Sequence, residues 1–361
     1  MRRPGLLWLM ILCILLSACS LKAETTLEPI DLTPDTPALA DVVEGPPVPA
    51  PPFGDKGRPP LQLTFVGDIM LARTPGEAVE SGLDPFAGTA TALDQGDLTV
   101  GNLECVIATT GKKVPKHYNF QCHPRILPWL ARHFDAVSVA NNHSGDYGKE
   151  AFMEQLDWLH GAQITPFGGG KNEAEAYQPV ILTKNGWRVA LIGVDGVELT
   201  SYAAGPDLPG VAWLYPERIA EAIRAVRPAV DLIVVMPHWG YEYTFGPARE
   251  HEEIAHLWLE SGADMVVGTH PHVIQPVHDY NGKLIAYSLG NFVFDDFKDV
   301  SAELNEPSRL SWILQVTVAE GGQQRWTVQT ARTDDQGLPQ LVSNDVVSCT
   351  AGAPECRPQP K

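Results

Sequence analysis

After residue 60 the chain alternates between short apolar runs rich in β-branched residues and longer amphipathic stretches. The apolar runs have the length and composition of buried strands and occupy residues 61–68, 97–104, 135–143, 231–238 and 263–270. The amphipathic stretches carry apolar side chains at helical spacing and occupy residues 148–162, 216–227 and 249–263. This alternation predicts an α/β protein.

Three turn signals add an antiparallel component to that sheet. Asn185-Gly186 and Asn281-Gly282 each lie between two apolar runs, and Asn-Gly is a favoured turn of two-residue hairpins. Gly321-Gly322 lies in a third pair of runs near the C-terminus. We therefore expect a mixed sheet with at least three hairpins.

The N-terminal residues have the pattern of an export signal. Arg2 and Arg3 precede the apolar run 6–16, which is too short for a comfortable membrane span and has the length of a signal-peptide core. It ends in Leu-Ser-Ala-Cys at 16–19, which resembles the bacterial lipobox. We expect acylation of Cys19 and an extracytoplasmic, lipid-anchored protein. The alternative is a plain secretory signal that is cleaved at another small residue.

Four segments follow from this pattern. A lipoprotein signal peptide is expected at 1–19, and a disordered tether at 20–60, where proline recurs and apolar periodicity is weak. The folded domain is expected at 61–335, and a C-terminal tail at 336–361. The tether would hold the domain away from the lipid surface.

Composition and cysteine content limit the class of protein further. The chain has 361 residues, 44% of them hydrophobic, which is enough for a large core. Its formal charge of −18 disfavours nucleic acid as a partner. Four cysteines outside the signal fit an exported chain, and the economical pairings are Cys105–Cys122 and Cys349–Cys356, with four free thiols as the alternative. No CxxC spacing occurs in the sequence, so the sequence does not indicate a structural zinc site.

Polar residues able to bind a metal ion recur where the predicted strands end. In α/β sheets, ligands lie outside the carboxyl ends of the strands, so we expect these side chains to converge. Carboxylate, amide and imidazole donors without cysteine suit one or two divalent ions such as Mn²⁺, Fe²⁺, Zn²⁺ or Mg²⁺. Such a site polarises an ester or amide oxygen, so hydrolysis is the natural inference. The residues are Asp68, Glu104, Asn142, His143, His238, His270, His272 and Asn291.

At these residues the chain resembles the CapA family of capsule-biosynthesis, or poly-γ-glutamate synthesis, proteins within the calcineurin-like metallophosphatase superfamily. Six blocks match in order over about residues 61–296: FVGDIML, GNLE, ANNH, HWGYEY, GADMVVGTHPHVIQP and YSLGNFVFD. The resemblance implies a metallophosphoesterase fold, in which a two-sheet β-sandwich is flanked by helices.

The resemblance also implies roles for the strand-end residues. Asp68 matches the first metal-ligand acid, and Glu104 takes the place of the acid that usually bridges two metals. Asn142 and His143 match an Asn-His pair that ligates a metal or positions the leaving group, and the sequence does not separate these two roles. The later histidines of the family match His238, His270 and His272 as metal ligands, with His238 also a catalytic candidate. Where the family's phosphatases have Asp-x-His, this chain has Met70, so one imidazole is missing.

Four neighbours of the strand ends are candidate substrate-binding residues. Arg73 is suited to neutralise a phosphate or carboxylate, although a surface arginine is the alternative. Trp239 is expected to wall the pocket, with core packing as the alternative. Glu242 is expected near the substrate or behind a histidine. Asn291 places an amide near the metals.

Two functions remain open at this point. One is a metal-dependent hydrolase of a phosphoester or of the amide of an acidic polymer. The other is a non-catalytic accessory protein that binds or exports an anionic capsule polymer, together with other capsule-synthesis proteins. Metal content and turnover would separate them.

Overall fold

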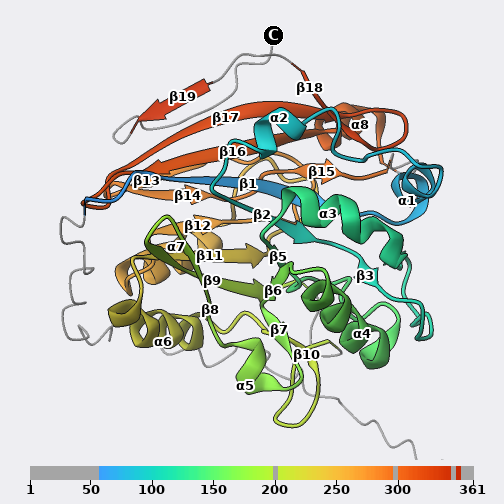
Figure 1. The fold of residues 1–361 in the computed structure, drawn as a ribbon, viewed down its shortest axis with the longest axis horizontal. Coiled ribbons are helices and arrows are strands. Elements are labelled where there is room, and N and C mark those ends of the chain that lie inside the picture. Colours follow the sequence, from blue (N-terminus) through green and yellow to red (C-terminus); the bar gives the residue numbers. More distant parts are fainter. Residues whose placement is uncertain (1–56, 198–201, 296–299, 343–346, 351–361) are drawn as a thin grey trace, which may run out of the picture. The chain divides into compact units, whose positions relative to one another are not determined.

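The computed structural model describes residues 57–197, 202–295, 300–342 and 347–350 (Figure 1). The signal peptide, the acylation site Cys19 and nearly all of the tether lie outside the described residues, as does the expected pairing of Cys349 with Cys356. In the part that is described, no helix combines the length and apolar character needed to cross a bilayer.

The first of two large sheets has nine strands and mixed direction. Strands β1, β2, β5 and β6 run parallel, whereas β16, β17 and β18 pair in antiparallel fashion. Its main path is β18 (Pro339–Leu341), β17 (Gln324–Thr333), β16 (Leu310–Val318), β1 (Leu61–Ile69), β2 (Leu98–Leu103), β5 (Ala136–Ser138) and β6 (Thr165–Phe167). In addition, β15 (Asn291–Val293) pairs with β1, and β19 (Val347–Thr350) with β17. The sheet thus continues past residue 335, where the sequence predicted the domain to end.

The second sheet has six strands with a parallel centre and a hairpin at each edge. Its order is β13 (Val277–Tyr280), β14 (Lys283–Ala286), β12 (Met265–Val267), β11 (Leu232–His238), β9 (Trp187–Asp195) and β8 (Val180–Lys184). The predicted Asn-Gly turns join β8 to β9 and β13 to β14, with Asn185 at φ 50° and Asn281 at φ 53°. The hairpin at Gly321-Gly322 joins β16 to β17. All three predicted hairpins are confirmed.

The two sheets pack face to face because apolar residues occupy both faces of their strands. In β11, Leu232, Val234 and Met236 face the other sheet, while Ile233 and Val235 pack under helices. Successive side chains of a strand point to opposite faces of the sheet, so both faces are buried only where another layer packs on each side. The predicted two-sheet sandwich flanked by helices is confirmed (Figure 1).

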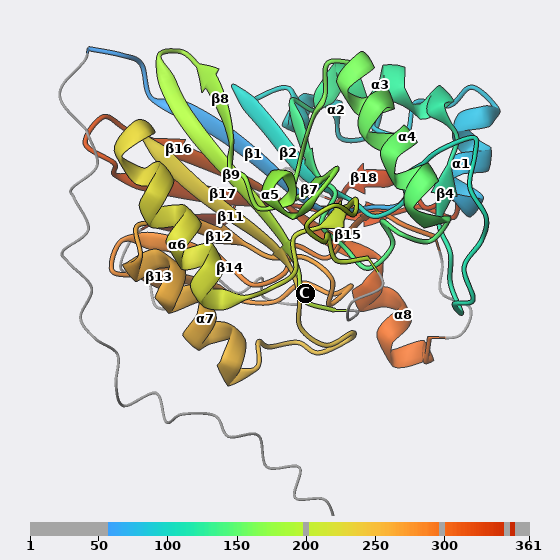
Figure 2. The same ribbon diagram turned by 90° about the horizontal axis from the view of Figure 1, so that it is seen from below.

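Helices cover both outer faces of the sandwich (Figure 2). The nine-stranded sheet is covered by α1 (Arg73–Glu80), α2 (Ala90–Leu93), α3 (Leu127–His133) and α4 (Gly148–Gly161). The six-stranded sheet is covered by α6 (Pro216–Val226) and α7 (Arg249–Glu260). The remaining elements are α5 (Glu173–Ala176), α8 (Ala302–Ser308), the pair β3 (Val106–Ile107) and β4 (Gln121–Cys122), and the pair β7 (Gly169–Gly170) and β10 (Gly210–Val211).

Strand β1 carries an irregularity just before its acidic residue. Its register with β2 shifts between Phe65 and Asp68. Gly67 lies within this stretch, and a Cβ there would stand 1.9 Å from the carbonyl oxygen of Gly290, so only glycine fits. Phe65 faces the sandwich and Ile69 faces the helices. A shift of this kind re-aims the side chains that follow it, and here it turns Asp68 toward the second sheet.

Candidate metal centre

The strand-end residues meet at one edge of the sandwich. Asp68 lies opposite Asn291 of β15 and Asn102 of β2, and all three side chains are fully buried. The second sheet contributes His238 at the end of β11, and the segment after β12 contributes His270 and His272. A bridge between His238 and Thr269 joins these two parts of the second sheet.

Glu104 is at the centre of this cluster. Its side chain is fully buried, and neither carboxylate oxygen has a hydrogen-bond partner among the described residues. The Nε2 atoms of His143, His238 and His272 lie 3.8, 3.9 and 3.8 Å from its Oε1. A carboxylate that is buried without partners costs several kcal/mol unless a cation balances it. The surroundings of Glu104 therefore fit a bound cation.

Asp68 and His272 complete the most compact set of donor atoms. One ligand atom from each of Asp68, Glu104 and His272 lies within 4.8 Å of the others, and His272 Nδ1 is 3.5 Å from Asp68 Oδ2. His270 stands beside them, with ring centroids 4.8 Å from His238 and 5.4 Å from His272, and its Nδ1 has no partner in the described structure. Two carboxylates and imidazoles without cysteine are donors that divalent ions accept.

Burial and mutual repulsion set the charge state of the cluster. Burial raises the pKa of Glu104 well above its usual value, and the neighbouring Asp68 raises it further. Burial, followed by the other imidazoles, lowers the pKa values of His238 and His270 well below the usual range. Burial also lowers the pKa of His272, but the hydrogen bond and charge of Asp68 outweigh it and the pKa ends above its usual value. Neutral imidazoles at His238 and His270 are the form that binds metal.

Hydrogen bonds behind the cluster hold two of its members in place. Asn102 Nδ2 donates to Asp68 Oδ1 at 2.8 Å, and the backbone N–H of His270 donates to Asp68 Oδ2 at 3.2 Å. Asn291 Oδ1 lies 2.8 Å from His272 Nδ1, while its Nδ2 donates to the carbonyl of Ser308. Asn291, predicted to place an amide near the metals and to contact substrate, lies against His272 of the cluster.

The Asn142–His143 pair divides into two different environments. Asn142 Oδ1 lies 3.0 Å from His238 Nε2, so its amide faces the metal cluster. His143 Nδ1 lies 2.6 Å from Asp146 Oδ2. Because a carboxylate only accepts, Nδ1 carries the hydrogen and Nε2 is left to face Glu104. Burial lowers the pKa of His143 despite the opposing effect of Asp146.

Sequence reasoning missed Asp146 and Lys116. Asp146 is fully buried and accepts both from His143 and from the backbone N–H of Phe120. Its three-residue spacing from His143 was the available signal. Lys116 Nζ donates to the carbonyl of Asn142 at 2.7 Å and pairs with Asp146 Oδ1 at 3.3 Å. The charge of Lys116 lowers the pKa of Glu104 and so offsets part of the larger increase that burial and Asp68 cause. No motif marks Lys116, because only the path of the β3–β4 connection brings it here.

The other predicted substrate residues have different surroundings. Arg73, at φ 52°, pairs with Asp295 at 2.7 Å, and its side chain is 42% exposed. Glu242 is exposed, and its charge raises the pKa of both Glu104 and His272. The prediction for Trp239 is wrong. Its ring stacks on Trp258 under α7, and its Nε1 donates to the carbonyl of Tyr287.

Met70 confirms the departure from the Asp-x-His pattern. Its side chain is fully buried, and its sulfur accepts from the backbone N–H of Ala72 at 3.3 Å. The thioether is thus engaged away from any ligand position. The site therefore has one imidazole fewer than the Asp-x-His pattern would supply.

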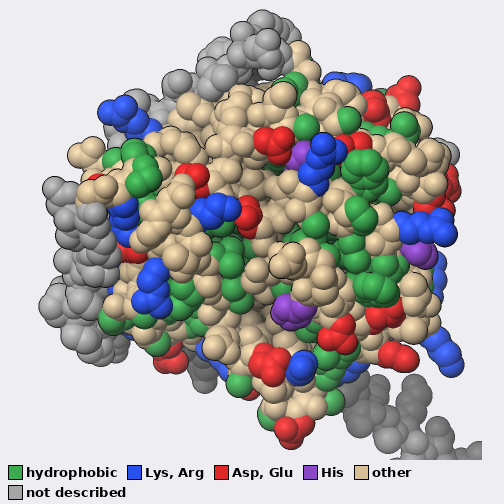
Figure 3. All heavy atoms as spheres, in the orientation of Figure 1, with side chains coloured by type: hydrophobic (Ala, Val, Ile, Leu, Met, Phe, Trp, Pro, Cys, Tyr) green, Lys and Arg blue, Asp and Glu red, His purple; other side chains and the backbone are tan. Residues whose placement is uncertain are grey.

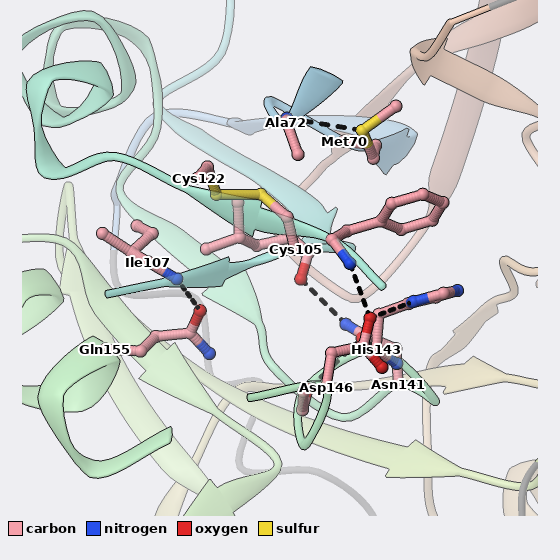
Figure 4. Close-up of a disulfide and its surroundings, with 12 residues drawn as sticks. Met70, Ala72, Cys105, Ile107, Cys122, Asn141, His143, Asp146 and Gln155 are labelled. Atoms are coloured by element: carbon pink, nitrogen blue, oxygen red, sulfur yellow. Dashed lines mark hydrogen bonds and ion pairs between the residues drawn. A yellow bond between two sulfur atoms is a disulfide. The ribbon is translucent and has the colours of Figure 1, made fainter. Parts of the chain in front are cut away.

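The disulfide Cys105–Cys122 lies near His143 (Figure 4) and closes the segment that contains β3 and β4. Cys105 directly follows Glu104 and is bonded to Cys122, which confirms this predicted pairing. The loop so closed carries Phe120, whose ring stacks on His143 with centroids 4.1 Å apart. The disulfide therefore positions both a metal-site carboxylate and the packing of His143.

We expect the double variant Cys105→Ser/Cys122→Ser to lose about 3 kcal/mol of unfolding free energy, because it frees a loop of 17 residues in the unfolded chain. Urea titration measures this loss. Metal affinity should also fall, because Glu104 loses its anchored neighbour. Reduction of the wild-type protein with a phosphine should reproduce both effects. An unfolding free energy unchanged within 0.5 kcal/mol would contradict the prediction.

Comparison with known protein families and sequences gives one consistent result. Residues 62–296 match the family described as "Bacterial capsule synthesis protein PGA_cap". The PGA biosynthesis protein CapA of Bacillus subtilis is 33% identical over 241 residues, covering 65% of this chain and 63% of that protein. The capsule biosynthesis protein CapA of Bacillus anthracis is 32% identical over 251 residues, covering 65% of this chain and 60% of that protein. The chain thus spans about three fifths of the length of these two relatives.

More distant similarities extend the comparison. A protein of Mycobacterium tuberculosis named as a probable polyglutamine synthesis accessory protein is 29% identical over 287 residues, covering 73% of this chain and 75% of that protein. Among solved structures, a phosphatase from Mycoplasma pneumoniae has a TM-score of 0.43 at 13% identity, covering 81% of this chain and 94% of that one. A 5'-nucleotidase precursor from Thermus thermophilus has a TM-score of 0.43 at 16% identity, covering 78% and 56%.

Proposed function

This chain belongs to the family of bacterial capsule synthesis proteins, and from that membership together with the geometry of the metal centre we propose that it is a metal-dependent hydrolase. Its substrate would be a phosphoester or the amide of an acidic capsule polymer such as poly-γ-glutamate. One observation carries the proposal: both oxygens of the fully buried Glu104 lack partners in the described structure while three imidazole nitrogens face one of them. A bound cation would balance the charge of such a group and stabilise its ionised form.

Asp68, Glu104 and His272 would hold the ion, with His238, His270 and Asn142 around it. The oxygen and imidazole donors suit Mn²⁺, Fe²⁺, Zn²⁺ or Mg²⁺. When bound, the ion supplies Lewis-acid polarisation of a phosphoryl or carbonyl oxygen.

The residues of the chain have separate roles in this proposal. His143 presents an unprotonated Nε2 to the cluster, where it would take up a proton from the attacking water and then pass it to the leaving group. Asp146 positions the ring through Nδ1 and stabilises the imidazolium. The ammonium of Lys116 supplies positive charge beside the cluster, where an anionic substrate needs it.

The proposed location is outside the cytoplasm, with the protein attached to the membrane through acylated Cys19 and the proline-rich tether. The Cys105–Cys122 disulfide supports an oxidising compartment, because such bonds are rare in reducing cytosol. Other capsule-synthesis proteins would be its partners there.

The second candidate function is a non-catalytic accessory protein that uses the metal site to bind the polymer. Met70 favours it, because the buried thioether leaves one ligand position without an imidazole. The name of the Mycobacterium tuberculosis relative also describes an accessory role.

The test is metal content together with turnover. The full-length protein, purified in detergent, is loaded separately with Mn²⁺, Zn²⁺, Fe²⁺ or Mg²⁺ and analysed by plasma mass spectrometry. Hydrolysis of bis-p-nitrophenyl phosphate and of γ-glutamyl peptides is then measured with and without chelator. We expect at least one tightly bound ion and chelator-sensitive turnover that is absent in Asp68→Ala and His270→Ala. Bound metal and polymer without turnover would favour the accessory function, and no bound metal would contradict both.

A further inference from the structure

A groove on the outer face of the nine-stranded sheet is separate from the metal centre. Its volume is about 330 Å³. It is formed by β1, β16, β17 and the turn between α2 and β2. The groove is at the start of β1, whereas Asp68 is near the end of that strand. Its polar lining consists of Gln62, Thr64, Gln95, Gln315, Thr317 and Thr327.

The outer face of this sheet changes from apolar to polar along its strands. Val66 of β1 and Ile313 of β16 belong to the apolar layer under the helices. Thr64 and Gln315 are two residues away on the same strands, so they point to the same face, and they lie opposite each other in register. The polar part of the face therefore begins where the helical layer ends.

Hydrogen bonds hold the amide side chains of the groove in place. Gln315 Nε2 donates to the carbonyl of Ala92 at 3.1 Å and to Gln95 Oε1 at 2.9 Å. Thr317 Oγ1 donates to Gln62 Oε1 at 2.7 Å. A glutamine amide has two donor hydrogens and two acceptor lone pairs, and these bonds use one acceptor position each of Gln62 and Gln95. The groove thus presents oriented donors and acceptors together.

Thr64 is the residue of the groove that a simple hydrated sheet face does not explain. It is 1% exposed, and its hydroxyl has no hydrogen-bond partner among the described residues. A buried hydroxyl without a partner destabilises the folded protein, whereas valine has nearly the same shape and no such cost. Gly96 leaves room beside the hydroxyl, since a Cβ there would stand 2.7 Å from Thr64 Oγ1. A ligand in the groove would supply the missing partner.

The lining of the groove contains no charged side chain among the described residues. Elsewhere charges are frequent, and Figure 3 shows acidic and basic side chains interspersed over one face of the molecule. Asp97 is close in sequence to the groove, but its carboxylate already accepts from the N–H of Gln62 at 2.8 Å and from Asn185 Nδ2 at 2.7 Å. Arg325 is opposite Thr317 in register but is exposed and does not line the groove. An ionic ligand would therefore find no countercharge in the groove.

We propose that this groove binds an uncharged sugar unit. Each sugar hydroxyl both donates and accepts hydrogen bonds, which matches the amides of Gln62 and Gln95 and the hydroxyls of Thr64, Thr317 and Thr327. The lining contains no aromatic side chain, so hydrogen bonds alone hold the ligand and the dissociation constant for one unit is about 1 mM. This site goes beyond the proposed hydrolase and requires neither its metal nor its turnover.

The test locates sugar binding by NMR. The full-length protein is purified in a detergent without a sugar headgroup, labelled with ¹³C at its threonine methyl groups, and titrated in chelator with N-acetylglucosamine and with its β-1,4-linked tetramer. We expect saturable shifts at Thr64, Thr317 and Thr327, which line the groove, and none at Thr183 on β8 of the other sheet. Glucosamine and glucuronate, which are charged, should bind more weakly.

Thr64→Val is expected to weaken binding at least about fivefold, because the ligand loses one hydrogen bond to the protein. The hydroxyl has no partner among the described residues, so the melting temperature of this variant should equal or exceed that of the wild type. The matched control is Thr183→Val, which makes the same change at an exposed strand position and should alter affinity less than about twofold.

Several results would overturn the assignment. The absence of shifts with both sugars would show that the groove is only hydrated, and shifts spread over threonines outside the groove would show non-specific contact. Tighter binding of glucosamine or glucuronate would contradict an uncharged ligand, and wild-type affinity in Thr64→Val would remove the role of the hydroxyl.

Two further measurements complete the test. Tighter binding of the tetramer than of the single sugar would support the site and identify a glycan chain as the source of the unit, whereas equal affinity would support it with a free sugar. Metal content and turnover of Thr64→Val should match the wild type. The sugar site therefore stands or fails independently of the proposed hydrolase.

Discussion

Replacing Glu104 with glutamine is expected to abolish metal binding and to lower turnover at least about 1,000-fold. Removal of a Lewis acid from the reacting centre costs several kcal/mol of transition-state stabilisation, and each 1.36 kcal/mol is a factor of ten in rate. The amide has the same shape as the carboxylate but no charge to balance a divalent cation. Plasma mass spectrometry and steady-state kinetics measure the two effects.

The same substitution should not unfold the protein. In the metal-free protein the Glu104 carboxylate is buried, has no hydrogen-bond partner among the described residues, and is repelled by Asp68. A neutral amide relieves that repulsion, so in chelator the melting temperature of Glu104→Gln should equal or exceed that of the wild type. Added metal should raise the melting temperature of the wild type and leave the variant unchanged.

Glu221→Gln is the matched control, because Glu221 is exposed on α6. It makes the same chemical change far from the cluster and should alter neither metal content nor turnover. A Glu104→Gln protein that retains the wild-type metal stoichiometry would contradict a metal site at Glu104.

Replacing His143 with glutamine is expected to lower turnover by 10²- to 10⁴-fold while metal binding is retained, the range that general acid–base groups supply. His143 Nε2 faces the cluster at 3.8 Å from Glu104, but Asp146 holds its other nitrogen, so the ring is placed for proton transfer. Glutamine accepts and donates hydrogen bonds but does not carry the proton.

The leaving group distinguishes this role from a structural one. If His143 delivers a proton, the loss should be large for an alkyl phosphoester and small for a p-nitrophenyl ester, whose anion leaves unaided. Asp146→Asn should also lose more turnover on the alkyl phosphoester than on the p-nitrophenyl ester, but by a smaller factor. The His143 ring keeps its place in this variant and loses only the charge that stabilises the imidazolium. His160→Gln, at an exposed position of α4, is the control. An equal loss for both esters would refute proton delivery by His143.

Much of the fold was predictable because its strands and helices carry strong local patterns. The bounds predicted at 61–68 and 231–238 agree with those of β1 and β11 to one residue, and the stretch at 148–162 corresponds to α4. The convergence of strand-end residues was also predictable, because parallel strands end at the same edge of a sheet.

For Trp239 the alternation of side chains along β11 favours the core-packing alternative. Side chains alternate along β11, so a residue after the inward-facing His238 must point to the opposite face. That face is covered by α7, and Trp239 is buried there beside Trp258. The period of the strand therefore predicts a core tryptophan.

The sequence by itself determined the elements, the donor types and the disulfide near Glu104, since each depends on a short stretch of chain or on a simple spacing. Only the tertiary structure decided that Lys116 and Asp146 stand beside the metal centre and that the shift in β1 turns Asp68 toward it. Contacts of this kind join segments whose separation along the chain carries no information about distance in space. They arise when two sheets and their connections pack together, and that packing is a property of the whole domain.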